Sequence, residues 1–205
     1  MKERGILMNA PMVRATLAGR KTQTRRVIKV KPWVEIEERD DGTKWPWFHD
    51  GENGVDVWIP CPYGQPGDLL WVREKWAAHW MYNDVAARDA RSGLPDDNLW
   101  YAADPESTAG THGCPAQGRR GKWRSSIHMP REASRLLLEV TEVRVQRLND
   151  ISEEDAVAEG LALPALITPG HVIGCFAQLW ESINGPDSWA ANPWVWCVSF
   201  RRIEA

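Results

Sequence analysis

The residues best suited to chemistry lie in one short segment near the amino terminus, residues 19–26, with the sequence GRKTQTRR. Gly19 is expected to end a helix, Lys21 to occupy the turn that follows, and Thr24 to lie on a strand. Because the chain changes direction at the glycine, the ammonium of Lys21 and the hydroxyl of Thr24 are expected to converge on one pocket. An amine beside a hydroxyl can activate that hydroxyl as a nucleophile.

Arginines flank these two side chains at Arg20, Arg25 and Arg26. Their guanidinium groups, with the backbone amides of the turn, could hold a phosphate or a carbonyl oxygen. The whole stretch from Arg14 to Lys31 has seven basic residues and no acidic one. The alternative interpretation is a solvated basic edge strand, in which the threonines are present for their β-propensity.

A second basic stretch, from Arg119 to Arg135, supplies the other candidate ligand-binding residues, which are Trp123, Arg124, His128 and Arg131. An exposed aromatic ring can stack on a base while cations follow the phosphate backbone. The net charge is only −3, so two local positive patches favour a specific anionic ligand over nonspecific coating of nucleic acid. A charged surface loop is the alternative for this stretch.

Tryptophan is unusually frequent, with 13 residues in the chain. Trp180, Trp194 and Trp196 fall in apolar patterns and are expected to fill the core. Trp33, Trp45, Trp47 and Trp123 lie in polar, loop-like surroundings, where a flat ring could instead stack on a base.

Composition excludes several classes of protein. No stretch approaches the roughly 20 apolar residues of a membrane-spanning helix, and the amino terminus is too short in apolar residues for a secretory signal. We therefore expect a cytoplasmic protein without membrane contact. The four cysteines form no CxxC pair, and free thiols are expected, buried at Cys175 and Cys197. His112 and Cys114, with Cys61 or His49, match no closed zinc pattern, so neither a metal nor a cofactor is expected.

The expected elements alternate without a repeating βαβ order. Residues 30–65 and 80–122 look like insertions, the first with a hairpin near Asp41-Gly42 and the second a long loop. In the long strand 136–148, the apolar residues before Thr141 and those after Glu142 fall on opposite faces. A β-bulge near Thr141-Glu142 would bring both sets onto one face. The predicted strands are 5–8, 22–28, 69–73, 136–148 and 194–201. The predicted helices are 11–18, 152–160 and one that opens at Pro169, with one apolar face formed by Val172, Ile173, Phe176, Leu179, Trp180 and Ile183.

This order favours an α+β fold with a mostly antiparallel, partly closed β-barrel, formed as a single domain over residues 1–205 with the two insertions.

The chain resembles the ASCH family, whose barrel is related to the RNA-binding PUA fold. The resemblance is carried by the segment Leu17–Arg26 (LAGRKTQTRR), by PGDLLWV at Pro66–Val72 and by the stretch Val140–Gly160. The sequences KWRSSIHMPR from Lys122 and NPWVW from Asn192 resemble the long ASCH proteins encoded by phages and prophages.

One branch of that family is similar to small amidohydrolases that remove the acetyl group of N4-acetylcytidine with a lysine, a threonine and a glutamate. The resemblance implies Lys21 and Thr24 for the first two, and Glu159 for the third, with Glu154 and Asp155 as nearby competitors. The chain is about twice as long as those hydrolases, so its insertions could fit the site to another substrate or to a polynucleotide.

The implied mechanism contains a conflict. A lysine can remove the proton of a threonine hydroxyl only if burial lowers its pKa from ~10.4 toward neutrality. A glutamate beside the lysine stabilises the charged ammonium and opposes that shift. Either Lys21 is the base and Glu159 positions it, or Lys21 stabilises an oxyanion and Glu159 is the base.

Three functions remain open. The leading hypothesis is an ASCH module that binds RNA, or a modified nucleobase or nucleoside, with single-stranded DNA as a possible ligand. The second adds hydrolysis of an N4-acylated cytidine. The third is a phage regulatory protein whose Trp-rich insertions bind a host protein.

Overall fold

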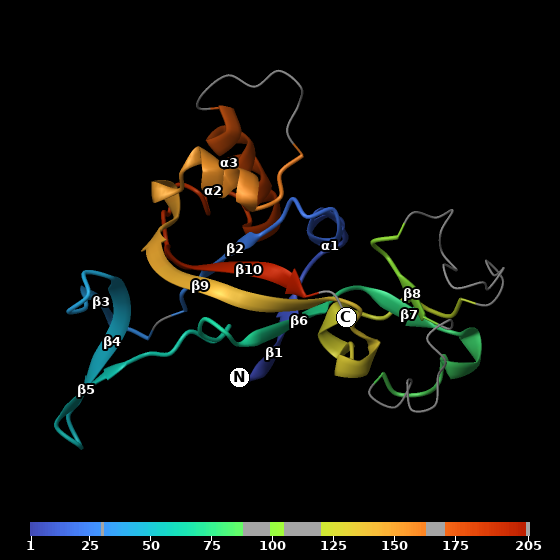
Figure 1. The fold of residues 1–205 in the computed structure, drawn as a ribbon, viewed down its shortest axis with the longest axis horizontal. Coiled ribbons are helices and arrows are strands. Elements are labelled where there is room, and N and C mark those ends of the chain that lie inside the picture. The colour runs from blue at the N-terminus through green and yellow to red at the C-terminus, as the bar shows by residue number, and fades with distance from the viewer. Residues whose placement is uncertain (30, 88–98, 105–119, 163–170, 204–205) are drawn as a thin grey trace. The chain divides into compact units, whose positions relative to one another are not determined.

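The chain forms two compact units, and each is assembled from separated stretches of sequence (Figure 1). The computed structural model describes residues 1–29, 31–87, 99–104, 120–162 and 171–203. The first unit comprises Met1–Gly19, Leu69–Glu139 and Arg202–Ala205. The second comprises Arg20–Asp68 and Val140–Arg201.

The first unit combines short strands with one regular helix. Its elements are β1 (Glu3–Leu7), α1 (Ala10–Leu17), β6 (Leu69–Arg73), β7 (Trp76–Ala78), η1 (Trp80–Tyr82), β8 (Leu99–Tyr101), η4 (Ser126–His128), η5 (Arg131–Ala133) and the start of β9 (Leu137–Arg147). Strand β6 pairs with β1 in parallel and with β9 antiparallel. Strands β7 and β8 pair antiparallel, and Trp76 of β7 belongs to a buried cluster that also contains Met129.

The second unit holds the larger helices. Its elements are β2 (Gln23–Val27), β3 (Glu35–Glu38), β4 (Lys44–Asp50), β5 (Val55–Trp58), the rest of β9, η6 (Leu148–Asp150), α2 (Glu153–Ala158), α3 (His171–Asn184) and most of β10 (Trp194–Ile203). Strand β2 pairs antiparallel with β10, and α2 and α3 pack together. Their shared core includes Ala156, Phe176, Trp180, Val195 and Cys197.

Local sequence signals explain the helix boundaries. The side chain of Asn9 accepts a hydrogen bond from the Met12 amide at 3.0 Å, and Pro11 occupies the first turn of α1. Gly19 follows with a φ of 70°, a left-handed conformation that glycine adopts without strain. The side chain of Ser152 caps α2 by accepting from the Asp155 amide at 3.1 Å. The predicted end of the first helix at Gly19 is confirmed.

Residues 35–58 form an independent antiparallel sheet, β3-β4-β5, which we call the small sheet (Figure 1). The predicted hairpin is present, because β3 and β4 pair around a turn that contains Gly42. The prediction did not anticipate β5, which follows a turn at residues 51–54.

The α+β class with mostly antiparallel pairing is confirmed, whereas no pairing among the described residues closes the sheet into a barrel. Thr141 and Glu142 are both exposed, which fits a change of face within β9. Ile183, the last residue of the predicted apolar helix face, is 45% exposed, whereas Val172, Phe176 and Trp180 of that face are buried. Cys175 is only partly buried, whereas Cys197 is fully buried. Part of the predicted loop 80–122 is regular, as β8 lies within it.

Two predictions fall outside the described residues. These are the opening of the third helix at Pro169 and the His112–Cys114 pair of the zinc alternative. Among the residues that are described, no group of histidine, cysteine or carboxylate side chains has an arrangement suited to a metal ion. None of the described helices has the length and apolar character needed to span a lipid bilayer.

Candidate functional site

The turn after α1 places Lys21 beside the end of α2. An isolated antiparallel bridge joins Lys21 to Glu159, and the Thr22 amide donates to the Ala158 carbonyl at 2.8 Å. Helix α2 ends at Ala158, and Gly160 beyond it has a φ of 88°. The start of β2 is therefore held by backbone hydrogen bonds against the carboxyl end of α2, although the two segments are far apart in sequence.

Lys21 is buried, with 2% of its surface exposed, and its ammonium has three acceptors. The Nζ atom donates to the Glu159 carboxylate at 2.7 Å, to the Glu159 carbonyl at 2.9 Å and to the Gln23 carbonyl at 2.9 Å. An ammonium has three hydrogens, so this set satisfies all of them. Glu159 is itself buried, so the pair is withdrawn from water.

Arg25 extends this group along β2. Its Nη1 atom donates to the Gln23 side-chain carbonyl at 2.6 Å and to Glu159 at 3.3 Å, and its Nη2 atom donates to Asp155 at 2.6 Å. Asp155 also accepts from Arg144 of β9 at 3.1 Å. We call these five side chains, with Lys21, the buried cluster: Lys21, Gln23, Arg25, Arg144, Asp155 and Glu159.

Two side chains of the buried cluster, Lys21 and Asp155, have pKa values displaced from their ordinary ones. Burial lowers the pKa of Lys21, and this effect outweighs the opposing attraction of Glu159. For Asp155 burial acts in the opposite direction, but Arg25 and Arg144 outweigh it and hold that pKa below its usual range. Of the two opposing effects on the pKa of Lys21 that the sequence suggested, desolvation is therefore the larger.

Thr24 lies next to the buried cluster but does not bond to it. Its side chain is buried, and strand alternation places it on the face of β2 opposite Gln23 and Arg25. The described residues show no hydrogen bond from its hydroxyl to Lys21 or to Glu159. The peptide carbonyl of Gln23, directly before Thr24, is the one that accepts from Lys21.

Two other predicted arginines have different environments. Arg20 is exposed and donates to the Gly160 carbonyl at 3.2 Å, so it lies at the same corner as the buried cluster. Arg26 is partly buried and alternates onto the same face of β2 as Thr24.

The second basic stretch lies in the first unit, and most of its cations have protein partners. Arg124 donates to the carbonyls of Tyr82 and Val85, and Arg131 donates to Glu3 at 2.7 Å. Arg135 forms a two-pronged ion pair with Glu74, at 2.9 and 3.1 Å. These guanidinium groups hold loops and strands together within that unit.

Trp123 differs from those arginines because the residue is 39% exposed. The guanidinium of Arg120 lies 4.4 Å and the ammonium of Lys75 5.9 Å from the ring centre. His128 is exposed in η4. The predicted residues therefore separate into two groups, one in each unit.

Sequence reasoning missed Gln23 and Arg144 as members of the buried cluster. One signal was available for the helical part: Asp155 and Glu159 are four residues apart, which places both carboxylates on one face of a helical turn. A second lay in β2, where Gln23 and Arg25 alternate onto one face.

Comparisons with known proteins add nothing to this geometry, since no family model, curated protein or solved structure matches the chain.

Proposed function

We propose that this chain is an ASCH-type protein with a PUA-like, partly closed barrel, and that it hydrolyses the amide of an N4-acylated cytosine at the Lys21–Glu159 pair. The observation that supports it is a buried lysine in direct contact with a buried carboxylate, with a pKa displaced downward by burial. Buried side chains whose pKa is displaced, as that of Lys21 is, concentrate at catalytic sites. The RNA-binding role expected of such a fold belongs to the same proposal.

The pair can exchange a proton internally. With Nζ and the carboxylate oxygen 2.7 Å apart, transfer converts an ammonium and a carboxylate into a neutral amine and a carboxylic acid. Loss of water around Lys21 favours its neutral amine. Lys21 then becomes a base and Glu159 an acid, so both roles left open by the sequence are served by one pair.

The reaction balances with Thr24 as the nucleophile, and it requires the Thr24 hydroxyl to turn from its own face of β2 toward Lys21. Its oxygen forms a bond to the acyl carbon as its proton passes to the Lys21 amine. The carbon–nitrogen bond breaks, and the departing N4 atom takes the proton of the Glu159 carboxyl group. Water then hydrolyses the acyl-threonine ester, releasing acetate and restoring the hydroxyl.

The test is release of cytidine from N4-acetylcytidine, followed by chromatography. Lys21→Met and Thr24→Val keep the volume of each buried side chain and remove its chemistry, so each is expected to lower kcat/KM about 100- to 10,000-fold. Thr24→Ser keeps the hydroxyl and is expected to retain turnover. Exposed Lys44→Ala and Thr22→Ala are the matched controls.

The pH profile of kcat/KM supplies a second readout. The mechanism needs the one proton that Lys21 and Glu159 share. Because burial lowers the pKa of Lys21, that proton is expected to be lost below the ordinary lysine value of 10.5, so kcat/KM should fall with rising pH before that value is reached. Absence of cytidine with the wild-type protein, or turnover that survives Lys21→Met, would refute the proposal. If Thr24→Val retains turnover and Lys21→Met does not, the nucleophile is water and not Thr24.

A further inference from the structure

The small sheet has two chemically different faces. Its register places Trp47 opposite Trp58 and Phe48 opposite Val57. Residues opposite one another in an antiparallel pair share a face, and neighbours along a strand alternate between faces. The two tryptophans therefore lie on one face, and Phe48 and Val57 lie on the other.

The tryptophan face carries an acidic recess of about 570 Å³. Its lining includes carboxylates from β3, from the turn after it and from Asp56 of β5. The guanidinium of Arg39 lies 4.0 Å from the centre of the Trp45 ring and 5.0 Å from that of Trp58. The carboxylates that surround these rings would repel a phosphate.

The opposite face carries a second recess, of about 380 Å³, with an apolar floor that includes Phe48, Val57 and Ile59. This volume is within the range of small-ligand sites, roughly 300–1,000 Å³. Its lining, which lies in the described part of the chain, includes no carboxylate. An uncharged, flat group would be accommodated here without electrostatic penalty.

The rim of this recess is basic and aromatic. Lys29 and Lys31 line it, and so does Trp33, whose side chain is 60% exposed. The Lys31 ammonium lies 4.9 Å from the centre of the Trp33 ring. An accessible ring beside two cations, over an apolar floor, has the composition of a site in which a base stacks and its phosphates are neutralised.

We propose that this recess holds one unpaired base of a single-stranded nucleic acid, with Trp33 stacked on the base and Lys29 and Lys31 on the flanking phosphates. The inference deepens the proposed function and rests on it for the class of ligand. It assigns to the first insertion the recognition of a strand that carries the substrate base. Charge decides between occupants: two cations with no carboxylate suit a polyanion better than a protein surface of mixed charge.

The experiment measures binding of a fluorescein-labelled, unpaired ten-nucleotide RNA by fluorescence anisotropy at several KCl concentrations. Each phosphate contact on a single strand contributes about 0.7 to the slope of log K against log salt. The double variant Lys29→Ala/Lys31→Ala is therefore expected to lower that slope by about 1.4. Trp33→Ala is expected to weaken binding about 5- to 150-fold, the range for loss of one stacked base.

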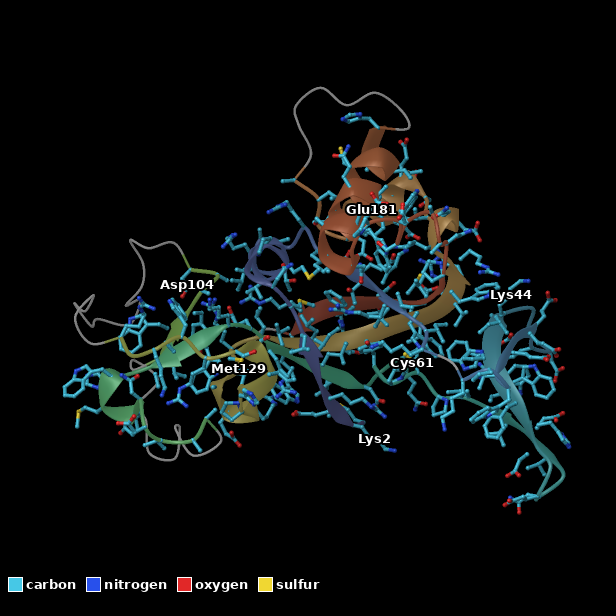
Figure 2. The ribbon with its side chains drawn as sticks, turned by 180° about the vertical axis from the view of Figure 1, so that it is seen from behind. Lys2, Lys44, Cys61, Asp104, Met129 and Glu181 are labelled. Carbon is cyan, nitrogen blue, oxygen red and sulfur yellow. The ribbon has the colours of Figure 1, made fainter. Side chains whose placement is uncertain are left out.

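Matched controls separate the recess from general charge. Lys44 lies on the small sheet (Figure 2) and does not line the recess; its ammonium is 5.9 Å from the centre of the Trp194 ring. Lys44→Ala therefore removes one positive charge from the small sheet outside the recess. Trp80→Ala removes a comparably exposed tryptophan, 53% exposed, from the first unit. Both are expected to bind as the wild type does.

Several results would overturn the inference. It fails if Lys44→Ala weakens binding as much as the lysine pair, if Trp33→Ala binds normally, or if the wild type does not bind the oligonucleotide. The last outcome would leave the recess to a protein partner. Hydrolysis of free N4-acetylcytidine reports separately on the proposed function, because a nucleoside has no strand to occupy the recess. Binding that depends on the recess, without hydrolysis, would refute only the proposed function. Hydrolysis without such binding would refute only this inference.

Discussion

At the scale of single residues, the buried cluster is notable for how completely its charges are paired. Lys21 and Arg25 have side chains with no exposed surface, and each contacts Glu159. Taking such charges out of water costs several kcal/mol for each ion, and good geometry only partly offsets that cost. Well-packed apolar side chains would stabilise the same corner at least as well. Retention of ions there is consistent with a chemical role.

Asp155 provides a pH-dependent test of the cluster. Arg25 and Arg144 lower its pKa against the effect of burial, so its stabilising contribution is full above the unfolded-state value of 3.8 and is lost as pH falls below it. Asp155→Asn is expected to lower the free energy of unfolding by about 1–3 kcal/mol at pH 7. That difference should shrink below pH 3.8.

Urea unfolding of the wild type and of Asp155→Asn across pH measures this difference. Asp150→Asn, at an exposed position in η6, is the control and is expected to have a small effect at every pH. An Asp155→Asn difference that is independent of pH would show that the carboxylate charge is not what stabilises the cluster.

The sequence predicted part of this site, for identifiable reasons. Lys21 was found because a basic turn beside a helix-ending glycine is a local pattern, and the resemblance pointed to Glu159. The contact between them depends on α2 lying against β2, which no local pattern encodes. The Thr24 hydroxyl was expected to join them, but strand alternation turns it to the other face of β2 from Gln23.

At the scale of elements, α2 is a short helix that depends on its surroundings. It spans only six residues, Glu153–Ala158, and isolated helices shorter than roughly 12 residues are marginal in water. The Ser152 cap, burial of Ala156 and the Lys21–Glu159 bridge hold it in place. It positions both carboxylates of the buried cluster, so stability and site geometry are linked here.

Ser152→Ala is therefore expected to lower the free energy of unfolding by about 1 kcal/mol, because the Asp155 amide loses its side-chain acceptor. Ser152→Asp keeps an acceptor at the cap and is expected to retain most of that stability. Chemical denaturation measures both variants. Equal losses in the two would mean that the hydrogen bond to the cap is not the stabilising contact.

Only part of the small sheet was predicted from the sequence. The hairpin at Gly42 was predicted because Asp-Gly is a strong turn signal. The third strand was missed because Val55–Trp58 is brief and is set off only by a turn of glycines and polar residues. The alternation of Asp56 and Trp58 with Val57 becomes informative only once the strand and its partner are known.

At the scale of the whole molecule, the chain passes between the two units at residues 19–20, 68–69, 139–140 and 201–202. Neither unit is a continuous segment, so a single cut cannot release either one intact. Both contain residues from the first and the second half of the sequence. Assembly of each unit therefore requires contacts between residues distant in sequence, which is typically slow because loops must close first.

Removal of residues 1–19 tests this organisation. It deletes β1, the parallel partner of β6, and α1, which buries Val13. Strand β6 then loses one neighbour, so the amides around Leu70 and Val72 are expected to exchange hydrogen much faster in the shortened chain. Hydrogen exchange followed by mass spectrometry measures this. Unchanged protection of β6 would show that the first unit does not need its amino-terminal segment.

The register of β4 and β5 limits how this protein can vary in length. Side chains on a strand repeat every two residues, so deletion of one residue from the turn 51–54 would rotate β5 relative to β4. Val57 would then share a face with Trp47, and Asp56 and Trp58 would move to the face that carries Phe48. Changes by an even number of residues would preserve the pattern, whereas odd changes would place the Asp56 carboxylate on the face that carries Phe48.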